Sequence, residues 1–100
     1  MAHLDSPEID GMQLAMIVSR DDFRDMLECA IEEGESRPIR RFLARRRLRN
    51  ERVLERTYQN VMADAPQQAF WTEDGKFDVK ALFEWLLENL PKILALIAMF

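Results

Sequence analysis

The sequence has few of the residues from which catalytic and metal sites are most often built. Its 100 residues include one cysteine, one histidine and three glycines. A lone Cys29 excludes an intrachain disulfide, and three glycines are too few for the loops that cradle phosphate groups. With His3 as the only histidine, we find neither a Ser-His-Asp arrangement nor a metal-ligand cluster. We therefore expect a non-enzymatic protein without cofactor or metal, although spacing alone does not test carboxylates that folding brings together.

Targeting signals are also lacking. The N-terminus has no basic segment followed by an apolar stretch, the pattern of a secretory signal. The most apolar segment, 82–100, lies at the lower length limit of a membrane span and is interrupted by charged residues and Pro91. We therefore expect a soluble, cytoplasmic protein.

Composition predicts the fold class. Hydrophobic residues make up 48% of the chain and charged residues 32%, with only four prolines, which favours one mostly helical domain. We predict an all-α fold: an antiparallel hairpin of an acidic and a basic helix, and an apolar C-terminal helix kinked at Pro91. Its predicted parts are a flexible arm at 1–10, the hairpin at 19–64, a linker at 65–77 and the C-terminal helix at 78–100.

Charge is distributed unevenly along the chain. Residues 1–35 carry ten acids against two arginines, a net of −8, and residues 36–64 carry nine arginines against three acids, a net of +6. Residues 65–100 carry five acids and three lysines, a net of −2. Because neighbouring segments have opposite signs, we expect them to pair.

The acidic helix of the hairpin has clear end signals. Ser19 is suited to accept from the backbone N–H of Asp22 as an N-cap, and Gly34 is suited to end the helix in a left-handed conformation. Apolar residues recur at helical spacing across 20–33, and Cys29 falls near that stripe, so we expect a buried thiol. The preceding apolar run, 12–18, is compatible with a strand or a helical turn.

The basic part of the hairpin begins at Pro38 and meets no helix breaker before Pro66. It is compatible with one long helix or with two helices broken near Asn50. Its first apolar group is expected to pack on the core, while Leu48 falls off that line; the group consists of Ile39, Phe42 and Leu43.

The arginine-rich segment 37–56 has three interpretations. Its arginines pair with acids of the preceding helix or of another subunit, bind the phosphates of RNA or DNA, or bind an acidic protein or a lipid head group. For nucleic-acid contact we single out Arg41, Arg45, Arg46 and Arg49.

The apolar C-terminal segment is the strongest candidate for an interaction surface. A helix that is apolar on every side needs cover, so we expect self-association into a homo-oligomer. The predicted interface residues are Leu82, Phe83, Trp85, Leu86, Leu90, Ile93, Leu94 and Ile97. Capture of a partner protein at this surface and peripheral membrane association through 82–100 are the alternatives.

Overall fold

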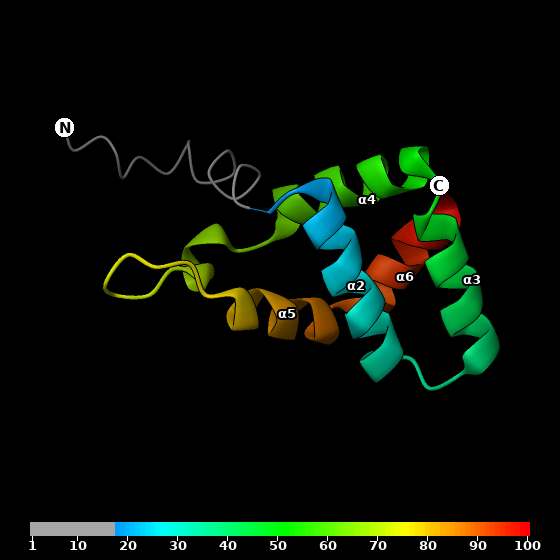
Figure 1. The fold of residues 1–100 in the computed structure, drawn as a ribbon, viewed down its shortest axis with the longest axis horizontal. Coiled ribbons are helices and arrows are strands. Elements are labelled where there is room, and N and C mark those ends of the chain that lie inside the picture. The colour runs from blue at the N-terminus through cyan, green and yellow to red at the C-terminus, as the bar shows by residue number, and fades with distance from the viewer. Residues whose placement is uncertain (1–17) are drawn as a thin grey trace.

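A computed structural model describes residues 18–100, apart from the side chains of Gln67 and Gln68. The predicted arm at 1–10 and the undecided segment before Val18 lie outside these residues. The described chain forms α2 (Arg20–Gly34), α3 (Pro38–Leu48), α4 (Glu51–Asp64), the 3-10 helix η3 (Gln67–Phe70), α5 (Val79–Glu88) and α6 (Leu90–Met99) (Figure 1). Its only β pairing is an isolated bridge between Trp71 and Phe77, so the all-α class is confirmed.

Helix α2 begins as predicted and ends differently. The Ser19 hydroxyl accepts from the Asp22 backbone N–H at 3.1 Å. Gly34 is the last residue of the helix and does not have a positive φ, so the predicted left-handed cap is wrong. The reason for a glycine here is steric: a Cβ at Gly34 would lie 2.5 Å from Leu90 Cδ2. The glycine thus lets α2 approach the start of α6.

The basic half of the hairpin consists of two helices. The Asn50 side chain accepts from the backbone N–H groups of Arg52 and Val53 at 2.9 and 3.3 Å. This cap satisfies two backbone donors at the start of α4, so the segment 38–64 forms two helices and not one. The break turns α4 across the hairpin, where it runs past the start of α2 (Figure 1).

The C-terminal segment also divides into two helices. Asp78 caps α5 by accepting from the Ala81 N–H at 3.0 Å, as expected of an N-cap. The interruption predicted at Pro91 is present, and it lies at Asn89, so that Pro91 falls in the first turn of α6. Proline is tolerated there because the N–H it lacks has no partner within the helix.

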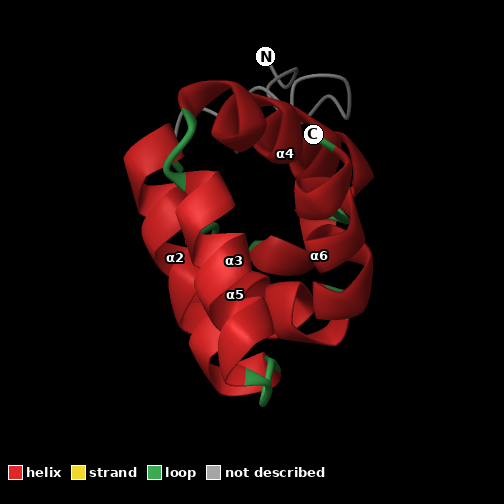
Figure 2. Cartoon of the chain, turned by 90° about the vertical axis from the view of Figure 1, so that its right-hand side faces the viewer, coloured by secondary structure: helices red, strands yellow, loops and turns green. Residues whose placement is uncertain are grey.

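The core lies between α2, α4 and the two C-terminal helices. Phe23 and Leu27 of α2 are fully buried, as are Leu82 and Leu86 of α5. Seen from the side, the helices surround a common interior, with α6 opposite α2 and α3 (Figure 2). Much of the apolar C-terminal segment therefore forms the centre of its own domain.

The predicted linker has structure of its own. Phe70 at the end of η3 is 1% exposed and packs edge-to-face on Trp85 and Phe77. The linker also contains a turn over 72–75, with Gly75 at a φ of 81° that favours glycine. These contacts fix the entry to α5.

Candidate interaction surfaces

The predicted C-terminal interface is mostly buried inside the described chain. The exposures of Leu82, Leu86, Leu90, Ile93 and Ile97 range from 0 to 2%. The other predicted interface residues are partly buried and pack against that core; they are Phe83, Trp85 and Leu94. The cover that this segment requires is thus supplied largely by α2, α3 and α4. An interface through the five buried residues would require the domain to open.

Helix α3 places its arginines on different faces. At 3.6 residues per turn, Arg41 and Arg45 point to α2, where both pair with Glu32 at 3.3 and 2.8 Å. Arg46 and Arg49 are exposed on the far side of the helix and form no ion pair with a described carboxylate. The four arginines predicted to contact nucleic acid therefore do not form one surface.

The expected pairing of the acidic and basic helices is present at Glu32. In the described chain this carboxylate makes both ion pairs between α2 and α3. A second link runs from α2 to α4, where Arg20 holds Glu55 through two bonds of 2.6 and 2.8 Å. The hydrogen bonds from Arg20 lower the pKa of Glu55 from its ordinary 4.5 to about 2.

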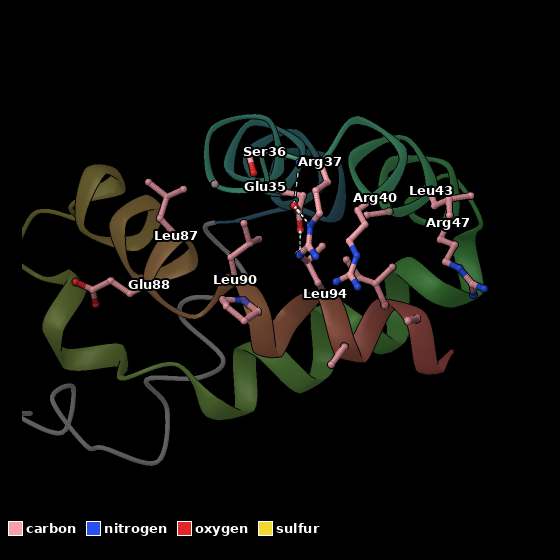
Figure 3. A pocket seen from close by; sticks show the side chains of 16 residues that line it. Glu35, Ser36, Arg37, Arg40, Leu43, Arg47, Leu87, Glu88, Leu90 and Leu94 are labelled. Atoms are coloured by element: carbon pink, nitrogen blue, oxygen red, sulfur yellow. Dashed lines mark hydrogen bonds and ion pairs between the residues drawn. The ribbon is translucent and has the colours of Figure 1, made fainter.

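A groove of about 860 Å³ lies between α3 and α6 (Figure 3). Its lining is formed by the turn after α2, one face of α3, the end of α5 and one face of α6. The apolar side chains that line it include Leu43 of α3, Leu87 of α5, and Leu90, Leu94 and Ile97 of α6. The cationic side chains are all on the α3 side: Arg37, Arg40 and Arg47.

The three groove arginines differ in their partners. Arg37 is held at the end of the groove by Glu35, which accepts from its Nε and its backbone N–H, both at 3.0 Å. These hydrogen bonds lower the pKa of the buried Glu35 carboxyl, which is 6% exposed. Arg40 and Arg47 form no ion pair with a described carboxylate, although the Glu35 carboxylate also interacts with Arg40 through its charge. With three arginines against Glu35 and Glu88, the lining of the groove has a net charge of +1.

The outer face of α3 exposes large apolar side chains. Ile39 is 74% exposed, Phe42 60% and Leu43 48%, so the prediction that this group packs on the core is wrong. Helix α3 instead faces the core through Ala44 and Leu48. The i, i+4 spacing of these two residues, together with Arg41 and Arg45 at the spacing that reaches α2, was the signal that sequence reasoning missed.

Reactive groups are sparse in the described chain. Cys29 is exposed rather than buried, because it lies beside the apolar stripe of α2 and faces solvent. Among the described residues no three His, Cys, Asp or Glu side chains are grouped as metal ligands would be. A smaller hollow of about 300 Å³ lies between α4 and α6, beside the ion pair of Lys92 and Asp64.

Comparisons add no functional information. No family model, no curated protein and no solved structure matches the chain. In the described part of the chain, none of the helices combines the length and the apolar character needed to cross a membrane.

Proposed function

We propose that the protein is a non-enzymatic helical interaction module that self-associates, and that the outer face of α3 forms the contact. One observation carries the proposal: Ile39, Phe42 and Leu43 stand exposed at i, i+3 and i+4 on a helix whose core residues are elsewhere. Exposed apolar groups gathered on one face of a domain are typical of protein contacts. Leu94 of the C-terminal segment is partly exposed and lines the groove together with Leu43, so this segment borders the outer face of α3.

The charges beside this face predict how association depends on salt. Arg46 and Arg49 flank Phe42, so two copies meeting through α3 would bring like charges together. Salt screens such repulsion, and it leaves apolar contact intact. We therefore expect self-association to persist or strengthen as salt rises, whereas an assembly built on acid–base pairs would dissociate.

Light scattering at low and high salt tests the proposal. The wild-type protein should exceed the monomer mass of 11.8 kDa, and Phe42→Glu should reduce it to the monomer. Val79→Glu is the matched control, since Val79 is also an exposed apolar residue, 55% exposed, and lies on α5. A monomeric wild type, or equal effects of both substitutions, would rule out this contact.

Nucleic-acid binding is the second candidate, and it is favoured by Arg46 and Arg49, which are exposed and form no ion pair with a carboxylate of residues 18–100. Binding through several phosphate contacts would weaken steeply as salt rises. A titration with duplex DNA and with structured RNA at low salt tests it, comparing wild type with Arg46→Ala/Arg49→Ala. Absence of binding, or binding that the double substitution leaves unchanged, would remove this candidate.

A further inference from the structure

The groove between α3 and α6 differs from the outer face of α3 in combining an apolar lining with charge. Leu43 lines it on the α3 side, and Leu87 and Leu94 line it from α5 and α6. Its volume of about 860 Å³ is as large as that of a small-molecule or cofactor pocket. The groove is formed within a single chain, so its occupation requires no opening of the domain.

The charge of the groove is positive and one-sided. Glu35 holds Arg37 through hydrogen bonds and acts on Arg40 only through its charge, so Arg40 and Arg47 are the lining cations without a direct ion pair to a described carboxylate. Arg40 extends from α3 towards α6, and Arg47 lies farther along the groove (Figure 3). The α6 wall adds Leu94, Ala95 and Ala98 and no charge of its own, while Glu88 at the end of α5 supplies the one further acid of the lining. A ligand is therefore met by cations on one wall and by apolar groups on the other.

The spacing of the arginine and leucine side chains along α3 favours a helical ligand. Arg40, Leu43 and Arg47 stand at i, i+3 and i+7, so the two arginines are separated by about 10.5 Å along the axis at 1.5 Å per residue. A helix with carboxylates seven residues apart and leucine-like residues between them repeats the same spacing. A ligand with a single anionic group would satisfy only one arginine, and a nucleic-acid backbone would leave the leucines without apolar contact.

We infer that this groove binds an acidic amphipathic helix of a partner protein, with two carboxylates on Arg40 and Arg47 and apolar side chains on Leu43 and Leu94. The mode is that of a helix laid in a groove. A second copy does not supply such a helix from its described residues, because the apolar stripe of the acidic α2 is buried in its own core. The inference rests on the proposed interaction function. The groove adjoins the self-association contact and shares Leu43 with it, whereas Phe42 belongs to that contact alone and Arg40 and Arg47 to the groove alone.

Fluorescence anisotropy with a defined peptide provides the test. The probe is a labelled three-heptad peptide with Glu at i and i+7 and Leu at i+3 and i+4, titrated with the full-length protein at low salt. The same composition in scrambled order, and the same sequence with Lys in place of Glu, are the control peptides. Wild type should bind the acidic amphipathic peptide and bind both controls at least about tenfold more weakly, since each close charge pair contributes on the order of tenfold.

Charge reversal on the protein identifies the groove. Arg40→Glu/Arg47→Glu should weaken binding of the acidic peptide by at least about tenfold and create binding of the lysine peptide. The matched control, Arg46→Glu/Arg49→Glu, reverses the same number of charges on the outer face of α3 and should change binding by less than about threefold. Circular dichroism of each variant establishes that the helices are intact.

Several results would overturn the inference. They are no binding of the acidic peptide, equal binding of the scrambled peptide, or an equal loss in the two double variants. A peptide with the sequence of residues 1–17, which is also acidic and apolar, is the competing probe. Tighter binding of that peptide would assign the groove to the protein's own segment. Because the proposed self-association is measured by mass, it can stand or fail separately.

Discussion

The apolar C-terminal segment buries most of its apolar side chains, whereas the arginine-rich α3 exposes several of its own. Composition alone would indicate the reverse. The C-terminal helices are apolar on nearly every side, yet Leu82, Leu86 and Ile97 are at most 1% exposed. Helix α3 is rich in arginine, yet Ile39 and Phe42 are among the most exposed large apolar side chains. The difference lies in which residues face the neighbouring helices: α5 and α6 turn their leucines and isoleucines towards the other elements, whereas α3 turns Ala44 and Leu48 inward and leaves Ile39 and Phe42 outside.

The difference in burial indicates where apolar side chains remain exposed for contact with another molecule. The hydrophobicity of a segment indicates how much apolar surface has to be buried. The packing of the other helices against that segment decides how much of this surface is buried. The C-terminal segment needs the most cover and receives most of it within the domain, although Met99 remains 71% exposed. Helix α3 needs less, and because its outer apolar residues receive none, we place the proposed contacts there.

The largest effect should come from a core residue of the C-terminal segment. Leu86→Ala removes a fully buried side chain and should lower the free energy of unfolding by about 2–5 kcal/mol. Val79→Ala in the same helix, where the side chain is 55% exposed, should change it by no more than about 0.5 kcal/mol. Urea denaturation followed by circular dichroism measures both, and equal losses would contradict the described burial.

The break between α3 and α4 should have an intermediate effect. Asn50→Ala removes the side chain that accepts from two backbone N–H groups at the start of α4, and should cost about 1 kcal/mol of stability. Asn60→Ala is the control, because Asn60 is exposed within α4 and caps no helix end. Thermal denaturation compares them. An unchanged or higher melting temperature for Asn50→Ala would argue for a continuous helix across 38–64.

The link between α2 and α4 predicts a dependence on pH. Glu55 has a pKa of about 2 in the folded protein, below its ordinary 4.5, because Arg20 donates to its carboxylate. Its contribution is therefore fully present above pH 4.5 and is lost as pH falls from 4.5 towards 2. The stability difference between wild type and Glu55→Gln should shrink across this window, as followed by urea denaturation at each pH. A difference independent of pH would contradict the ion pair, and Glu51→Gln, on the exposed face of α4, is the control.

The smallest effect should come from the outer face of α3. Phe42→Ala should change the stability of the monomer by less than about 0.5 kcal/mol, because its side chain is 60% exposed. Leu48→Ala in the same helix should cost about 2–5 kcal/mol, since Leu48 is fully buried. Denaturation at low protein concentration, where association contributes least, measures the pair. A large loss for Phe42→Ala would place that side chain in the core after all.

Helix ends and fold class were predictable because they depend on neighbouring residues. The caps formed by Ser19 and Asp78 each join a side chain to a backbone group three residues away, so local spacing reveals them. A break near Asn50 was one of two alternatives, beside one long helix, because the cap at Asn50 also depends only on nearby residues. Gly34 was misread because its role depends on Leu90, which is far away in sequence.

The sequence by itself determined an all-α chain, the caps at Ser19 and Asp78, and a strong charge contrast between consecutive segments. It left the break at Asn50 as one of two alternatives. Only the tertiary structure decided which side of each helix is covered. Leu48 faces the core while Phe42 faces outward, and Arg41 reaches Glu32 while Arg40 lines the groove. The reason is physical: capping is settled within one turn of the chain, whereas burial is settled by contacts between helices distant in sequence.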